Sequence, residues 1–119
     1  MIDSNNKKLI YDAGIQIDWS QGEFIQLGPK LVKDLSGNIK IQEAIDTLST
    51  KGTLFPIEVF KKIGNFDKKN FPHYLSDYEF TCRASRAGYK LLLSYQAKVF
   101  NDMKRTGIGK DISYQIGPK

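Results

Sequence analysis

Apolar and polar residues alternate along the segment that runs from Ile15 through Ile17 to Trp19. A period of two is typical of a strand that buries one of its faces. Residues 20–22, with the sequence SQG, follow at once and favour a hairpin turn. We therefore predict a β-hairpin whose returning strand covers residues 24–27, where apolar side chains resume.

Residues 28–38 are rich in turn-forming residues and predict no long element. The next segment, residues 41–50, reads IQEAIDTLST and is compatible with either a strand or a helix. We favour a strand from Ala44 to Ser49.

A short helix is predicted to begin at Pro56, because the missing N–H of proline costs nothing in a first helical turn. Val59, Phe60 and Ile63 fall on one apolar face of this helix. Gly64 is the expected terminator with a left-handed backbone.

A second helix is predicted from Ser76, which forms the pattern S-x-x-E with Glu79. In such a capping box each side chain bonds the free backbone N–H of the other residue. Phe80 and Ala84 fall on one face, and Gly88 ends the helix. Two further strands are then predicted on either side of a short turn, in the sequences YKLLLSY and AKVF.

The order of strands, helix, loop, helix and strands predicts an α/β fold of α+β type, with one mixed sheet and two main helices. A chain of 119 residues suits a single domain, residues 1–119. We expect residues 1–7 and 108–119 to be loose tails.

The net charge of +5 comes mainly from lysines that are scattered along the chain in pairs. Scattered lysine is most often a solvated surface, although it also attracts anionic partners. A nucleic-acid partner is not expected, because the sequence has no aromatic–basic ribonucleoprotein pattern, no zinc-finger spacing and no arginine cluster. It also has no P-loop, no glycine-rich nucleotide loop and no Asp-x-Asp metal motif.

The segment GTLFPIEVFKKIGNFDKKNFPHYLSDYEFTCRASRAGYKLLLSYQAKVFND, residues 52–102, resembles the C-terminal half of glycosyltransferase family 2. The segment IYDAGIQIDWSQGEFIQLG, residues 10–28, more loosely resembles rhamnosyltransferase-like members. The resemblance implies an inverting enzyme and a partial GT-A fold without the N-terminal half that binds the nucleotide. The chain is accordingly expected to be an acceptor-side fragment that is inactive alone. Whether it is a cloned piece, a truncated reading frame or one subunit of a split enzyme is left open.

By resemblance, Asp77 matches the catalytic base, which takes the proton of the attacking acceptor hydroxyl. A carboxylate in a first helical turn is also explained by the helix dipole alone, which it stabilises by about 0.3–1 kcal/mol. The candidates for contact with the acceptor are Gly52, Thr53, His73, Tyr74 and Ser76. Tyr74, Phe71 and Tyr78 are candidates for a wall that stacks on sugar rings, with core packing as the alternative.

Three residues are candidates for support rather than contact: Asp67, Glu79 and Arg83. The capping box already explains Glu79, and Arg83 is placed for an i,i+4 ion pair with it or for support of the Asp77 helix. Asn101, Lys104 and Arg105 are candidates for contact with the diphosphate. Asn101 also replaces a family histidine that completes a metal site, which makes it the one candidate metal ligand.

No cofactor is expected in this chain, whereas the intact enzyme can use Mg²⁺ or Mn²⁺. The expected partners of that enzyme are a nucleotide-sugar donor and a saccharide or lipid-linked acceptor. Self-association, or pairing with an N-terminal half, is expected if an incomplete fold exposes its sheet edges. We expect a cytoplasmic location, with peripheral contact at the inner face of the membrane as an option. The alternative function is a basic, non-catalytic module that docks on an anionic membrane or on a partner subunit.

Overall fold

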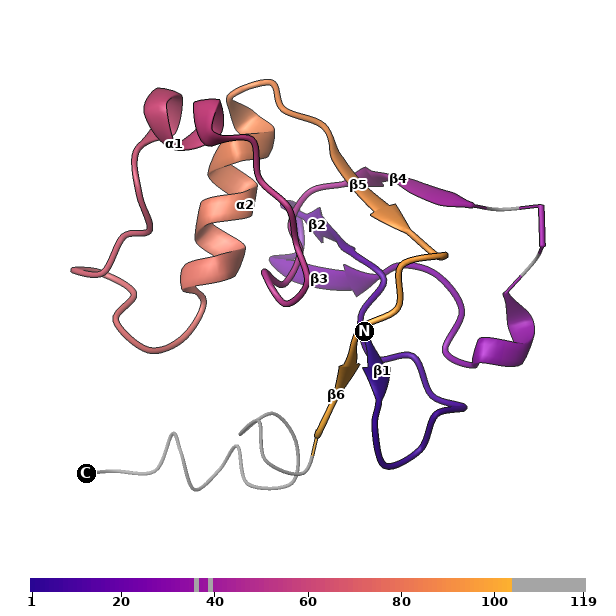
Figure 1. The fold of residues 1–119 in the computed structure, drawn as a ribbon. Coiled ribbons are helices and arrows are strands. Elements are labelled where there is room, and N and C mark those ends of the chain that lie inside the picture. The colour runs from indigo at the N-terminus through magenta and orange to yellow at the C-terminus, as the bar shows by residue number, and fades with distance from the viewer. Residues whose placement is uncertain (36, 39, 104–119) are drawn as a thin grey trace.

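The computed structural model describes residues 1–35, 37, 38 and 40–103 (Figure 1). Two α-helices and one 3₁₀ helix are present in this part of the chain: α1 (Ile57–Ile63), α2 (Ser76–Arg86) and η1 (Val32–Asp34). The strands are β1 (Ile2–Asp3), β2 (Ile15–Asp18), β3 (Glu23–Gln26), β4 (Ile41–Ile45), β5 (Leu91–Ser94) and β6 (Phe100–Asn101).

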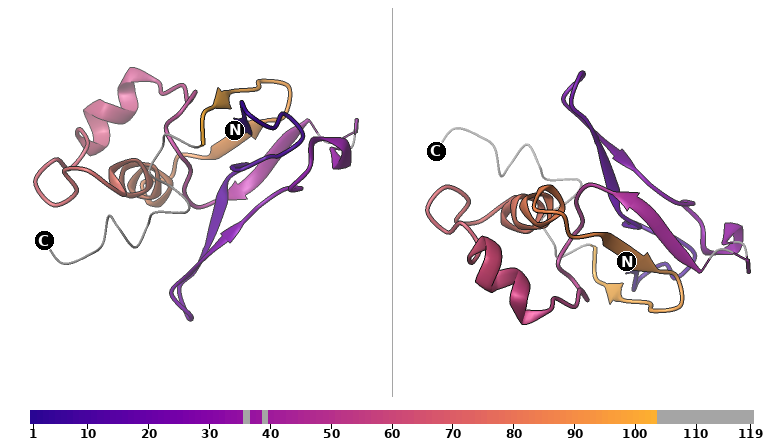
Figure 2. Two further views of the ribbon diagram at one scale, coloured as in Figure 1. Left: turned by 90° about the horizontal axis from the view of Figure 1, so that it is seen from below. Right: turned by 90° about the horizontal axis from the view of Figure 1, so that it is seen from above.

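The molecule is a small mixed α/β domain, compatible with the α+β class. Both α-helices lie together at one side, β4 and β5 lie at the other, and the β2–β3 hairpin projects between them (Figures 1 and 2). The prediction of one mixed sheet is wrong for the described residues. They form three two-stranded sheets: β1–β6 is parallel, whereas β2–β3 and β4–β5 are antiparallel.

The predicted hairpin is confirmed. Ile17 pairs with Phe24 and Asp18 with Glu23, so the turn falls within the SQG sequence. Strand β3 is exposed along its whole length, because β2 contacts the rest of the domain and β3 forms the outer edge. The link to the interior is the buried Ile15, which bridges to Thr47.

The strand predicted at residues 44–49 lies earlier in the chain, at Ile41–Ile45. Ala44 has a φ of 57°, and the pairing of β4 with β5 shifts register between Gln42 and Ile45. This irregularity lies within the ladder, which continues to the pairing of Ile45 with Leu91. The residues after Ile45 then lead toward α2. The hydroxyl groups of Thr47 and Thr81 provide the hydrogen bonds that link Thr47 and Leu48 to α2.

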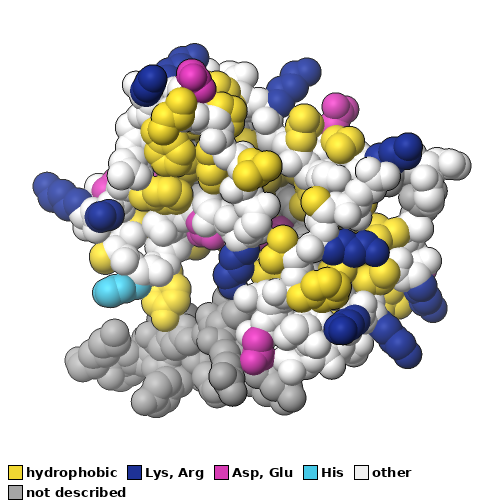
Figure 3. All heavy atoms as spheres, in the orientation of Figure 1, with side chains coloured by type: hydrophobic (Ala, Val, Ile, Leu, Met, Phe, Trp, Pro, Cys, Tyr) yellow, Lys and Arg dark blue, Asp and Glu magenta, His cyan; other side chains and the backbone are white. Residues whose placement is uncertain are grey.

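Both predicted helices are present, and they share an aromatic core. Phe80 is fully buried and packs against Phe66 with ring centroids 4.3 Å apart. Phe60 lies 5.1 Å and Phe55 5.3 Å from Phe80 by the same measure. Hydrophobic side chains accordingly gather around the helices in Figure 3, whereas lysines and arginines are dispersed over that face.

The predicted capping box is wrong. The residue before α2 is Leu75, in the left-handed conformation, and no side chain caps this end of the helix. Ser76 is therefore already helical, and the N–H of Glu79 bonds the carbonyl oxygen of Leu75 at 2.8 Å. The Glu79 carboxylate instead accepts hydrogen bonds from Arg83.

Residues 1–7 were expected to be a loose tail, but Ile2 and Asp3 form β1 and are buried. The N–H of Ile2 bonds the carbonyl oxygen of Val99 at 2.8 Å, next to the parallel pairing with β6. The second predicted tail, 108–119, lies outside the described residues.

Candidate functional site

An open cavity of about 780 Å³ lies at the start of α2. It is lined by residues of three segments, 11–12, 49–51 and 73–78, by Phe24 and Gln26 of the hairpin, and by Met1 and Met103. We call it the Asp77 cavity. The turn after the β4 segment and the first turn of α2 thus share one wall, as expected if the helix start borders a cleft.

Asp77 lies in the first turn of α2 and is half-buried. One carboxylate oxygen, Oδ1, accepts a hydrogen bond from the N–H of Tyr78 at 2.9 Å. The other, Oδ2, accepts a longer one from the N–H of Thr50 at 3.4 Å. Two backbone donors therefore orient the carboxylate without an ion pair among the described residues, and each oxygen retains a lone pair for a ligand.

Thr81 fixes α2 against the wall that carries Thr50. Its buried hydroxyl group lies 2.8 Å from the hydroxyl of Thr47 and 2.9 Å from the carbonyl oxygen of Asp77. It also lies 3.1 Å from both the N–H and the carbonyl oxygen of Leu48. Sequence reasoning missed this residue, because a threonine within a helical pattern carries no signal of its distant partners.

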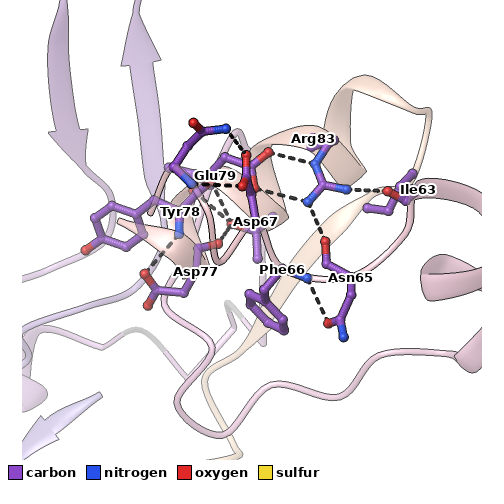
Figure 4. A network of polar contacts seen from close by, with 11 residues as sticks. Ile63, Asn65, Phe66, Asp67, Asp77, Tyr78, Glu79 and Arg83 are labelled. Carbon is purple, nitrogen blue, oxygen red and sulfur yellow. Dashed lines mark hydrogen bonds and ion pairs between the residues drawn. The ribbon is translucent and has the colours of Figure 1, made fainter. Parts of the chain in front are cut away.

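Arg83 links α2 to the loop after α1, as Figure 4 shows. Its Nε donates to Glu79 Oε1 at 2.7 Å, and its Nη2 donates to the carbonyl oxygen of Asn65 at 2.9 Å. A further bond joins Nη1 to the carbonyl oxygen of Ile63. Arg83 and Glu79 are not among the lining residues of the Asp77 cavity. These bonds hold α2 against the loop after α1, which fits a supporting role for both residues.

Asp67 orders the next part of the same loop. Its carboxylate accepts hydrogen bonds from the backbone N–H of Asn70 at 3.0 Å and from its side chain at 2.8 Å. The side-chain bond is the main cause that lowers the pKa of Asp67 below its usual value. This geometry agrees with the predicted role in ordering the loop.

Gly52 and Thr53 do not line the Asp77 cavity but a neighbouring cavity of about 260 Å³. Gly52 has a φ of 72°, and a Cβ added there would collide with Cγ2 of Val99. The Thr53 hydroxyl donates to the carbonyl oxygen of Ser49 at 2.9 Å and closes the turn. Backbone conformation and packing therefore account for a glycine and a threonine at these two positions, independently of any contact with a sugar.

The other candidates for acceptor contact, His73, Tyr74 and Ser76, all line the Asp77 cavity. Tyr78 lines it as well, whereas Phe71 does not. The wall also includes Phe24, whose ring lies edge-on to that of Tyr78 with centroids 5.8 Å apart.

Asn101 lies in β6 and is not among the lining residues of the Asp77 cavity. Its side-chain nitrogen donates to the sulfur atom of Met103 at 3.3 Å, and Met103 does line the cavity. Lys104 and Arg105, the other two candidates for diphosphate contact, lie outside the described residues.

A second carboxylate on the cavity, Asp12, was missed by sequence reasoning. The signal for it was the sequence DAG, in which glycine two residues after aspartate favours a turn closed by the aspartate side chain. Burial, with smaller contributions from the charges of Asp12 and Asp77, raises the pKa of Tyr78 to about 12. The tyrosine hydroxyl is therefore a neutral hydrogen-bond donor at neutral pH.

Within the described ranges, no three acidic, histidine or cysteine side chains are grouped as a metal site would need. In the same ranges, no helix is both long and apolar enough to cross a membrane.

Comparisons with models of known protein families, with curated proteins and with solved structures found no match for this chain.

Proposed function

We propose that this chain forms the acceptor side of an inverting glycosyltransferase and that Asp77 is its general base. The proposal rests on the resemblance of residues 52–102 to glycosyltransferase family 2. The observation that carries it is the position of Asp77, because its carboxylate lies on a large open cavity and is oriented by two backbone N–H groups.

The reaction is a single displacement. The acceptor hydroxyl oxygen attacks the anomeric carbon of the donor sugar, and the bond from that carbon to the diphosphate oxygen breaks. The electron pair of that bond leaves with the nucleoside diphosphate, while Asp77 takes the hydroxyl proton in the transition state. Attack from the face opposite the leaving group inverts the anomeric configuration.

A general base must keep its position while the acceptor hydroxyl forms its new bond to the donor sugar. Thr81 supplies that rigidity, because its hydroxyl group accepts a hydrogen bond from the N–H of Leu48 while it donates one to the carbonyl oxygen of Asp77. The Arg83 and Glu79 pair holds the following turn of α2 to the loop after α1. These residues position the base and do not touch the reacting atoms.

The nucleotide-sugar donor is proposed to be bound mainly by a further part of the protein. A divalent cation in the intact enzyme would absorb the charge that develops on the leaving diphosphate. Asn101 is the candidate in this chain for contact at that site.

The test is transfer by the protein in its genomic context, with any segments or neighbouring reading frames that are encoded beside it. Release of nucleoside diphosphate from a panel of nucleotide sugars is followed with and without candidate saccharide acceptors. The expected result is acceptor-dependent release, with a product of inverted anomeric configuration by NMR. Retained configuration, or no acceptor-dependent release from any donor, contradicts the proposal. The chain of residues 1–119 alone is expected to be inactive in the same assay.

A further inference from the structure

Asp12 presents a carboxylate to the Asp77 cavity although only 8% of the residue is exposed. Its Oδ1 accepts a hydrogen bond from the N–H of Gly14 at 2.9 Å. Gly14 itself has a φ of 94°, and a Cβ added there would lie 2.8 Å from Cδ1 of Ile45. The turn that holds the Asp12 carboxylate is therefore fixed by packing that only glycine permits.

The second oxygen of this carboxylate, Oδ2, is accessible. In the part of the chain that the structure describes, Asp12 has no ion pair, and its side chain makes no other hydrogen bond. Among the same residues, every buried side-chain oxygen or nitrogen has a hydrogen-bond partner. An oxygen without a partner must then be accessible, and the Asp77 cavity, at about 780 Å³, is larger than the three other cavities that Asp12 lines. A carboxylate fixed on one side and open on the other is suited to accept hydrogen bonds from a ligand.

The rest of the cavity wall indicates the class of ligand. Tyr11, Phe24 and Tyr74 line it and remain about half exposed, at 45%, 53% and 62%. Aromatic faces of this kind suit the apolar faces of sugar rings. Lys51 lines the same cavity as the two carboxylates and offsets part of their charge. Aromatic faces beside carboxylate oxygens fit a ligand that is rich in hydroxyl groups.

We propose that Asp12 is a saccharide-binding residue, which accepts hydrogen bonds from ring hydroxyl groups and so selects and orients the acceptor for Asp77. The role of the bound saccharide as acceptor rests on the proposed function. Saccharide binding by Asp12 can be measured without any glycosyl transfer. Asp77 then takes the proton of one hydroxyl group, while Asp12 holds other hydroxyl groups of the same ring.

The test is binding of methyl glycosides of glucose, galactose, mannose and rhamnose to the 119-residue chain, followed by amide NMR shifts. The N–H of Gly14 is the reporter, because it donates to the carboxylate that is proposed to bind the sugar. We expect saturable binding of at least one glycoside, with shifts at Gly14 and in residues 73–78. Asp12→Asn should weaken that binding about tenfold or more, as expected for loss of hydrogen bonds to a charged acceptor.

Asp18→Asn is the matched control. Asp18 also closes a turn through its Oδ1, which accepts hydrogen bonds from Ser20 and Gln21, but it lies outside the cavity. This control should bind the glycoside like the unmodified chain. In case Asp12→Asn alters the fold, single-deoxy analogues are tested on the unmodified chain. One of them should lose affinity to a similar extent, and its loss should not add to that of Asp12→Asn.

Two results would overturn the inference: no glycoside binds saturably, or Asp12→Asn binds like the unmodified chain. Binding that depends on Asp12, together with no transfer in the assay above, would leave this inference standing and remove the proposed function. Transfer activity together with an acceptor affinity that is unchanged in Asp12→Asn would support the proposed function and overturn this inference.

Discussion

The hydroxyl oxygens of Thr47 and Thr81 lie 2.8 Å apart, and both residues are fully buried. This contact joins the segment that leaves the β4–β5 sheet to the second turn of α2. Because Thr81 also bonds the carbonyl oxygen of Asp77, the pair determines where the candidate base stands relative to Thr50.

Replacement of Thr81 by valine should destabilise the fold. The two side chains have similar volumes, but valine leaves the Thr47 hydroxyl and the N–H of Leu48 without this partner. We expect a loss of about 1–3 kcal/mol in the free energy of unfolding, measured by urea denaturation. Thr81→Ser keeps the hydroxyl group and should retain most of the hydrogen-bond contribution. Equal stability of the valine and serine variants would show that the hydroxyl network does not hold α2 in place.

Replacement of Arg83 by lysine should loosen the loop after α1. A single ammonium group cannot bond Glu79 and the carbonyl oxygens of Ile63 and Asn65 together, as the guanidinium does. The expected loss is about 1 kcal/mol, because the ion pair is partly exposed.

Faster amide hydrogen exchange in residues 63–70 is the specific readout for Arg83→Lys. Arg86→Lys is the control, since Arg86 stacks over Trp19 at 4.5 Å and forms no hydrogen bond or ion pair with that loop in the described part of the chain. Unchanged exchange in the Arg83 variant, or an equal increase in the control, would contradict the supporting role.

Leu75 should be a position where glycine is better tolerated than alanine. Its φ of 63° is left-handed, a conformation that costs an ordinary residue about 1–2 kcal/mol. We expect Leu75→Gly to be more stable than Leu75→Ala by about 1 kcal/mol in thermal or urea unfolding, the reverse of the usual order. Both variants remove the half-exposed leucine side chain beyond Cβ, so their difference comes from the backbone and the single methyl group of alanine. The usual order, with alanine more stable, would show that Leu75 bears no strain at the edge of the cavity.

Stability should fall at alkaline pH because of Tyr78. Its pKa in the folded protein is about 12, above the ordinary value of 10.0. The contribution of the buried phenol to the free energy of unfolding is fully present below pH 10, where Tyr78 is protonated in both the folded and the unfolded protein. Between pH 10 and 12 the unfolded chain releases the proton first, so stability is lost as the pH rises. Urea denaturation between pH 9 and pH 11.5 should show a steeper decline for the unmodified chain than for Tyr78→Phe. Parallel curves would contradict burial of this phenol.

Sequence patterns predicted those helices and strands that are determined by their own residues and not by distant contacts. The hairpin follows from alternation around Ile17 and from the SQG turn, and α1 follows from Pro56 and its apolar face. The capping box failed because Leu75 enters α2 in a left-handed conformation, which supplies its carbonyl oxygen to the N–H of Glu79. No short-range pattern indicates that a leucine will accept such a backbone.

The candidate site was predictable only in part for a similar reason. His73, Tyr74, Ser76 and Asp77 are neighbours in sequence and line one cavity together. Asp12 and Thr81 depend on contacts between segments that are far apart along the chain, such as the bonds from Thr81 to Thr47 and Leu48. Gly52 was predicted to contact the acceptor; it lines a neighbouring cavity, and its φ of 72° and its close approach to Val99 give it a packing role as well.

The central claim is that Asp77 is the base, and its most direct test is the turnover of Asp77→Asn in the complete enzyme. An amide can still accept a hydrogen bond from Thr50 or Tyr78, so the fold should persist, but it cannot take a proton. We predict that kcat falls by about 10²–10⁴-fold while the dissociation constant of the donor stays nearly unchanged. A variant that retains turnover within about tenfold of the unmodified enzyme would contradict the claim and leave Asp77 as a helix-end carboxylate alone.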